Sequence, residues 1–192
     1  MSHLLDFISF EERLVLLEHF VHGSRSYCAN RRVGSKFDQG DDQLDQYWSW
    51  LKGTVGAYVL ESAIKFRVLC DTAASEEGRS RVKSLDEAAC NERTICTLVE
   101  GEFEVSLREL SSKIIHAIHV VPVWATARRG STNFKYWSGH LDLSGTHQRK
   151  PWNLSLSVSE WAAAMQHFLH NAESSELTLY IGQDWYPRPS AA

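Results

Sequence analysis

The chain of 192 residues, with 43% hydrophobic and 23% charged residues, has the length and composition of a single soluble globular domain. Its formal net charge of -4 argues against nonspecific nucleic-acid binding by the whole surface, although a local basic patch is compatible with it. No apolar run reaches the length needed to span a bilayer, and the N-terminus lacks a signal-peptide pattern. We therefore expect a cytoplasmic protein without a membrane partner and with reduced thiols, since no C-x-x-C pairing occurs among Cys28, Cys70, Cys90 and Cys96.

The first predicted helix begins at a capping-box pattern. Ser9 is followed three residues later by Glu12, and apolar positions then recur at helical spacing until about His22, just before Gly23. The polar segment 23–40 is predicted to be a long loop. Because it carries a local excess of positive charge, an arm that contacts phosphate is the alternative. Its cations are Arg25, Arg31, Arg32 and Lys36.

One long helix is predicted from Asp41 to about Thr72, because apolar residues recur throughout at helical spacing. Gly53 and Gly56 weaken its middle and favour a kink or a close helix approach there.

A further helix is predicted after a polar connection over residues 73–83. Ser84 and Glu87 have capping-box spacing, and the apolar pattern continues to about Glu100, before Gly101.

The next helix is predicted to run from about Leu107 to His119, because Ser106 and Glu109 again have the spacing of a capping box. At about 100° per residue, one face of this helix is an apolar stripe. The stripe consists of Leu107, Leu110, Ile114 and Ile118. The opposite face carries a polar ridge of Arg108, Ser112, His116 and His119.

The polar ridge combines the side chains that hold a phosphate with those that transfer a proton near neutral pH. A guanidinium pairs with phosphate oxygens, and an imidazole changes its charge close to pH 7. We therefore take Arg108, Ser112, His116 and His119 as candidate catalytic residues. The alternative is an ordinary solvated helix face.

After Pro122 the pattern changes from helical to alternating. Strands are predicted over 136–143 and 152–158, with a turn-rich segment between them, and 177–181 is a candidate third strand. A last helix is predicted over 159–170.

These elements predict a mainly α fold in one domain, residues 1–192. It comprises a helical bundle over 9–120, a small β element over 136–158, and a C-terminal helix over 159–170. The β element is an antiparallel hairpin, or a three-stranded sheet if 177–181 adds a strand. The aromatic cluster 182–186 is predicted to close the sheet onto the bundle, with ligand stacking as the alternative.

The order of the helices, with a late helix that ends in Lys-Ile-Ile-His, resembles the HEPN superfamily. Leu107–His116 is similar to the HEPN motif helix, and Trp50–Leu69 is similar to its packing partner. Many HEPN domains are metal-independent endoribonucleases of bacterial toxin and antiphage systems, which dimerise and place an Arg and a His from each subunit at a shared cleft. The resemblance implies a homodimer in a bacterial defence or toxin–antitoxin system, with RNA and a partner protein as candidate partners and with no cofactor.

The motif departs from the active family, which has Arg-Asn where this chain has Ser111 and Ser112. The nearest upstream Arg is Arg108, eight residues before His116. In the enzyme hypothesis, His116 is the general acid or base, Arg108 stabilises charge and Ser112 positions the phosphate, while RNA supplies its 2′-hydroxyl as nucleophile. In the alternative, the domain is a catalytically inactive scaffold, and Arg108 and His119 make polar contacts across a two-fold axis.

A metal site is a third hypothesis, since His116 and His119 are three residues apart and His140 and His147 follow in the sequence. No matching carboxylate completes a known motif, so we predict neither a metal nor a cofactor.

Overall fold

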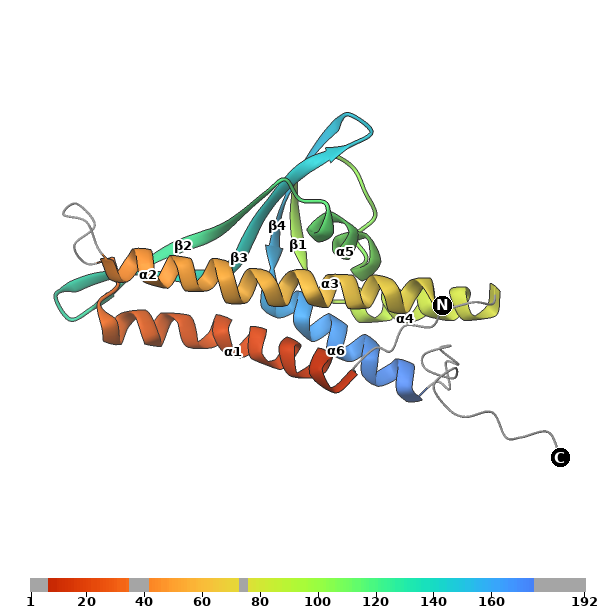
Figure 1. The fold of residues 1–192 in the computed structure, drawn as a ribbon, viewed down its shortest axis with the longest axis horizontal. Helices are drawn as coiled ribbons and strands as arrows, with labels where there is room; N and C mark the ends of the chain where they lie inside the picture. The colour runs from red at the N-terminus through yellow and green to blue at the C-terminus, as the bar shows by residue number, and fades with distance from the viewer. Residues whose placement is uncertain (1–6, 35–41, 73–75, 175–192) are drawn as a thin grey trace.

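The structure is a computed structural model that describes residues 7–34, 42–72 and 76–174 (Figure 1). In chain order its elements are α1 (Phe7–Arg31), α2 (Asp42–Trp50), a π-helical segment (Leu51–Val55), α3 (Gly56–Asp71), α4 (Glu76–Cys90), β1 (Cys96–Glu100), α5 (Leu107–Ile115), β2 (His119–Arg129), β3 (Thr132–His147), β4 (Lys150–Ser157) and α6 (Val158–Ser174). The predicted strand 177–181 and the aromatic cluster 182–186 lie outside the described residues.

The four strands form one antiparallel sheet in the order β1-β4-β3-β2. Helices α1, α3 and α6 pack together beneath it, and α1 also contacts β3 (Figure 1). The core lies between these helices and the buried face of the sheet. Within it the rings of Phe66 on α3 and Phe168 on α6 meet edge to face, with centroids 4.9 Å apart, and Trp161 of α6 is also fully buried.

The prediction of a mainly α bundle with a small hairpin or three-stranded sheet is wrong, because the fold is mixed α/β with a four-stranded sheet. The predicted hairpin is present as β3 and β4, but the sequence assigned β1 and β2 to helices or left them unassigned. Residues 94–99 fit helical spacing, yet they are rich in Thr, Ile and Val, whose branched side chains favour a strand once a partner exists. The partner is β4, and Cys96 lies opposite Leu156.

The predicted end of the first helix at Gly23 is also wrong, because α1 continues to Arg31. The buried face of α1 does not stop at the glycine. It continues through Ser24 and Cys28, two small side chains that are almost completely buried. Ser24 and Cys28 therefore continue the buried face of Leu14 and Leu17 at helical spacing. The polar composition of 23–40 does not indicate this face.

The long helix predicted from 41 to 72 is confirmed over residues 42–71 as a continuous helical run, in which the π-helical segment Leu51–Val55 contains Gly53 and is capped by Gly56. The capping box predicted at Ser84 is wrong, because α4 already begins at Glu76 and Ser84 lies inside it.

Helix α1 takes the place of a strand along the first half of β3. Strand β4 pairs with β3 only from His140 to His147. Before that point, the backbone N–H of Lys135 donates to the carbonyl of Val33 at 2.8 Å, and the N–H of Trp137 donates to Ser24 Oγ at 3.1 Å. Two backbone donors of β3 are thereby satisfied, one by the turn that follows α1 and one by α1 itself.

None of the helices within the described ranges is both long and apolar enough to cross a membrane. The four cysteines are not in disulfides, as predicted. Burial raises the pKa of the Cys70 and Cys90 thiols to about 12, so both stay protonated at neutral pH.

Gly139 of β3 offers a direct test of the close approach between α1 and the sheet. Its φ is +88°, and an added Cβ would lie 2.5 Å from Cγ1 of Val21. Gly139→Ala is expected to lower the free energy of unfolding by about 2–4 kcal/mol, measured by urea denaturation, because backbone strain and overpacking act together. Gly130→Ala is the matched control, since its φ is +61° but no atom lies within 4 Å; it should cost about 1 kcal/mol. Equal losses in the two variants would contradict the close approach.

Candidate functional site

Helix α5, which carries the predicted motif, begins with two side-chain caps. Ser106 Oγ accepts a hydrogen bond from the backbone N–H of Glu109 at 3.1 Å, so the predicted capping box is confirmed. Asp86 of α4 adds a second cap: its carboxylate accepts from the N–H of Leu107 at 2.7 Å and from that of Arg108 at 3.1 Å. Asp86 is only 6% exposed, so its buried negative charge is stabilised at the positive end of the helix.

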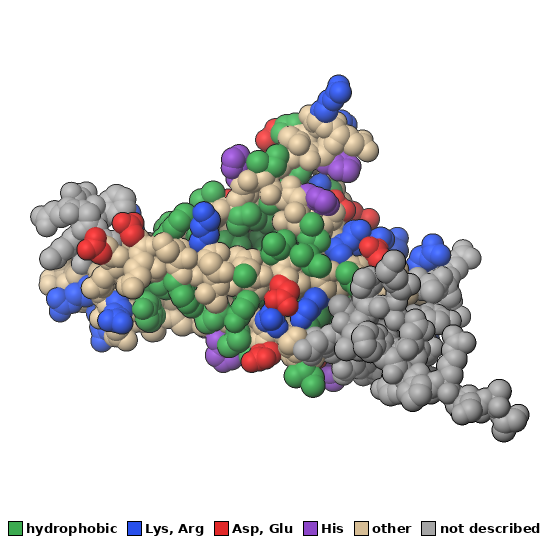
Figure 2. All heavy atoms as spheres, viewed as in Figure 1, with side chains coloured by type: hydrophobic (Ala, Val, Ile, Leu, Met, Phe, Trp, Pro, Cys, Tyr) green, Lys and Arg blue, Asp and Glu red, His purple; other side chains and the backbone are tan. Residues whose placement is uncertain are grey.

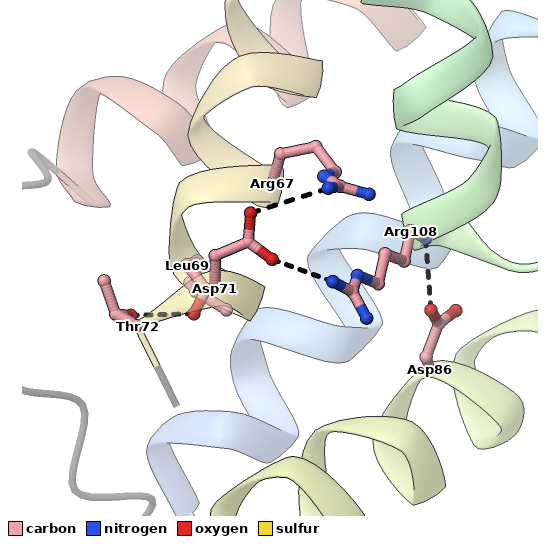
Figure 3. A network of polar contacts seen from close by, with 6 residues as sticks. All are labelled: Arg67, Leu69, Asp71, Thr72, Asp86 and Arg108. Carbon is pink, nitrogen blue, oxygen red and sulfur yellow. Dashed lines mark hydrogen bonds and ion pairs between the residues drawn. The ribbon is translucent and has the colours of Figure 1, made fainter. Parts of the chain in front are cut away.

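The guanidinium of Arg108 is already paired with a carboxylate. Its Nη2 lies 2.9 Å from Asp71 Oδ1 at the end of α3, and Asp71 Oδ2 lies 3.5 Å from Nη2 of Arg67 (Figure 3). Both partners are about half exposed. Arg108 therefore joins α5 to α3, and a phosphate group would have to compete with Asp71 for it.

The polar ridge is not continuous in the structure. Helix α5 ends at Ile115, His116 is its exposed C-terminal cap residue, and His119 is the first residue of β2. The helix ends because the chain joins the sheet, where the N–H of Ile118 donates to the carbonyl of Ser144 at 2.9 Å. The predicted extension of the helix to His119 is therefore wrong.

Arg108 and the half-buried Ser112 share α5, and His116 lies at its end. The catalytic roles assigned to these residues and to His119 remain predictions. Lys113, the other cation of the motif, is buried between the rings of Phe103 and Trp152, 4.9 and 5.1 Å from their centroids, so it serves packing.

A second region combines an open cavity with aromatic and polar side chains. A cavity of about 700 Å³ lies along α1 and α2, within the size range of about 300–1,000 Å³ that is typical of ligand sites. We call it the aromatic groove. It is lined by His19, Phe20, Gly23, Ser24, Tyr27, Arg31, Val33, Gln43, Gln46, Tyr47 and Trp50.

Four aromatic rings follow one another along the aromatic groove. The rings of Tyr27 and Tyr47 are stacked with centroids 5.4 Å apart, and those of Tyr47 and Trp50 are stacked at 5.7 Å. Phe20 meets Trp50 edge to face at 5.1 Å. Two of the four rings keep large exposed fractions, 50% for Tyr27 and 40% for Trp50. The groove therefore offers flat aromatic surface to solvent.

The floor of the aromatic groove is polar but uncharged. The hydroxyl of Tyr47 donates to Ser24 Oγ at 2.8 Å. Burial raises the pKa of Tyr47 above its ordinary value and raises that of the Cys28 thiol to about 11. Both groups are therefore neutral at physiological pH, and the floor does not repel an anionic ligand.

Cations surround the end of α1, where it meets the hairpin between β2 and β3. Arg129 Nη1 donates to the Asn30 side chain, and the guanidinium of Arg25 lies 5.8 Å from the centroid of the Tyr136 ring. We call this set the basic end; its members are Arg25, Arg31, Arg32, Arg128, Arg129 and Lys135. Figure 2 shows blue side chains over this end of the molecule. Three of the cations belong to the segment in which the sequence indicated a phosphate-contacting arm.

No group of three His, Cys, Asp or Glu side chains placed to hold a metal ion occurs within residues 7–34, 42–72 and 76–174. Comparisons with protein-family models, curated proteins and solved structures found no match. The resemblance to HEPN domains consequently stays a prediction.

The aromatic groove was not found from the sequence, although two local signals were present. Tyr27 and Arg31 are four residues apart, and Tyr47 and Trp50 are three apart, so each pair shares a helix face. The first pair was missed because the polar composition of 23–40 predicts a loop. The second lies within the helix predicted over 41–72, where aromatic residues do not by themselves indicate a ligand site.

Asp86 provides a test of how α5 is held. Asp86→Ala is expected to lower the free energy of unfolding by about 1–3 kcal/mol in urea denaturation, because two backbone N–H groups lose their acceptor in a buried place. Asp71→Ala, which removes a half-exposed ion pair, should cost less than about 1 kcal/mol. A larger loss for Asp71→Ala than for Asp86→Ala would contradict the assignment of Asp86 as the principal anchor.

Proposed function

We propose that this protein binds single-stranded RNA through the basic end. The observation that carries the proposal is the concentration of six cations at one end of a chain whose formal net charge is -4. Three come from α1 or the turn that follows it, and three come from β2 and β3. Elements distant in sequence thus build one positively charged surface.

Among the described residues, this end carries fewer carboxylates than cations. The first turn of α2 carries Asp42 and Asp45. Binding of a phosphate backbone needs clustered Lys and Arg rather than an overall positive charge, because each contact releases condensed counterions from the nucleic acid. Two of the six cations, Arg128 and Arg129, are exposed at the tip of a hairpin, where a strand has access to them.

RNA, rather than DNA, is proposed because of the resemblance to HEPN domains. The same resemblance supports a place in a bacterial defence or toxin–antitoxin system. Binding without cleavage is favoured over the ribonuclease hypothesis, since the candidate catalytic cation Arg108 is held by Asp71 and the ridge that joined it to His119 is interrupted.

The proposal is tested with a labelled RNA of about 12 nucleotides and fluorescence polarisation. Arg32→Ala combined with Arg129→Ala removes two cations of the basic end. If each contacts one phosphate, affinity should fall about 25-fold at about 0.1 M salt, and the slope of log K against log salt should fall by about 1.4.

The matched control is Arg149→Ala combined with Lys150→Ala, which removes two exposed cations from the β3–β4 hairpin at another end of the molecule (Figure 1). It should leave the affinity within about two-fold. Equal losses in the two double variants, or tighter binding of DNA of the same sequence, would contradict the proposal.

Cleavage is read in the same samples, in EDTA, by gel electrophoresis. We expect the RNA to stay intact with the wild type. Cleavage that is lost in both Arg108→Ala and His116→Ala would instead support the metal-independent nuclease, with His116→Ala combined with His119→Ala as the control for substitution by the second imidazole.

We further propose that the protein forms a homodimer through a surface of α3 and β2. β2 is at the edge of the sheet, and apolar side chains are exposed on it and on α3. Leu60 of α3 and Val120 of β2 line a cavity of about 250 Å³, and Figure 2 shows hydrophobic side chains gathered above α3. Pairing of two identical edge strands in antiparallel orientation gives a two-fold interface. The exposed apolar side chains are Leu60 and Ile64 of α3, Val120 and Val121 of β2, and Ile118 directly before β2.

Leu60→Lys combined with Val120→Lys should convert the dimer to a monomer in analytical ultracentrifugation at tens of micromolar (roughly 50 µM), because both side chains line that cavity and two charges would be buried in the interface. Val99→Lys on the other edge strand, β1, is the control, since Val99 is also exposed and apolar. A wild-type protein that sediments as a monomer at this concentration would sink the dimer proposal.

A further inference from the structure

We infer, on the basis of the proposed RNA binding, that the aromatic groove is a subsite for a nucleobase of the bound strand. The basic end holds the sugar–phosphate backbone, and the groove beside it receives a base that points away from the backbone.

The geometry of the rings fits a flat aromatic ligand. Tyr27, Tyr47 and Trp50 are stacked with interplanar angles of 25° and 20°, so their faces form a nearly parallel series. The ends of the series are the exposed rings. A base that stacks on such a ring strengthens the binding of a single strand roughly five-fold to more than a hundred-fold, whatever its sequence.

Polar side chains in the groove match the edge of a base. His19 Nδ1 lies 2.8 Å from the carbonyl of Val15, which can only accept, so the proton of the neutral ring is on Nδ1. Its Nε2 is then a hydrogen-bond acceptor. The amide of Gln46 supplies two donors and an acceptor. These are the groups that bind exocyclic amines and ring nitrogens of bases.

Arg31 connects the two parts of the proposed site. It lines the aromatic groove and is also a member of the basic end. Its guanidinium lies 6.0 Å from the centroid of the Tyr27 ring. A phosphate bound at Arg31 would therefore be next to the ring on which its base stacks. The two parts of the site are close enough to bind the phosphate and the base of one nucleotide.

The competing occupant is an acidic peptide, which could also use Arg31. The series of parallel rings and the neutral polar floor of Ser24 and Tyr47 favour a base, because a peptide carboxylate gains nothing from stacked rings.

The test compares an RNA of about 12 uridines with an abasic strand of the same length and backbone. The wild type should bind the uridine strand about ten-fold or more tightly than the abasic strand. Tyr27→Leu combined with Trp50→Leu should abolish this preference while leaving the affinity for the abasic strand unchanged, which also shows that the variant is folded. Trp48→Leu is the matched control, because Trp48 is similarly exposed on α2 but does not line the groove; it should keep the preference.

The failures of the two proposals differ. Equal binding of the uridine and abasic strands by the wild type overturns the base subsite and leaves RNA binding intact, whereas binding of neither strand overturns RNA binding itself. A double variant that loses affinity for both strands equally also overturns the subsite, because the rings would then only support the fold. Binding of polyglutamate that is lost in Tyr27→Leu combined with Trp50→Leu assigns the groove to an acidic peptide and overturns the base subsite.

Discussion

The arrangement of the molecule depends on the edge of β3 that α1 covers. In a strand, the backbone N–H groups of alternate residues point to the same side. Those of Lys135 and Trp137 find their acceptors at Val33, in the turn that follows α1, and at Ser24 Oγ on α1. Since a buried N–H without an acceptor is costly, this half of β3 fixes how α1 lies against the sheet. The Ser24 hydroxyl also accepts from Tyr47, which positions α2 beside α1. The aromatic groove is the space between two helices held in this way.

The contacts at the start of α5 show that Arg108, a candidate catalytic residue, has a structural role. Arg108 and Asp86 are both at the N-terminus of α5, where the helix dipole is positive. The buried carboxylate compensates that end, while the guanidinium extends to Asp71. Anion and cation thereby tie α5 to α4 and to α3. Arg and His on a helix face are thus weak evidence for catalysis until their partners are known.

The sequence was informative where local signals decide the structure and misleading where long-range pairing does. The capping box at Ser106 and the helix over 41–72 follow from residues close in the chain, and both were predicted. Residues 96–100 and 119–129 are strands because β4 and β3 offer them backbone partners, which no local pattern reveals. The aromatic groove depended on α1 continuing past Gly23, and the buried face that carries it there consists of small residues that hydrophobicity does not mark.

Strand β2 has an apolar first part and a basic last part, which are separated by the register shift between Pro122 and Trp124. Its first part exposes Val120 and Val121, and its last residues are Arg128 and Arg129 of the basic end. Antiparallel pairing through the first parts of two copies would direct the two last parts away from each other. The basic ends would then lie at opposite extremities of the dimer, each with its own aromatic groove. Such a dimer would offer two separate surfaces for the proposed RNA binding, and it would differ in this respect from a nuclease whose subunits share one cleft.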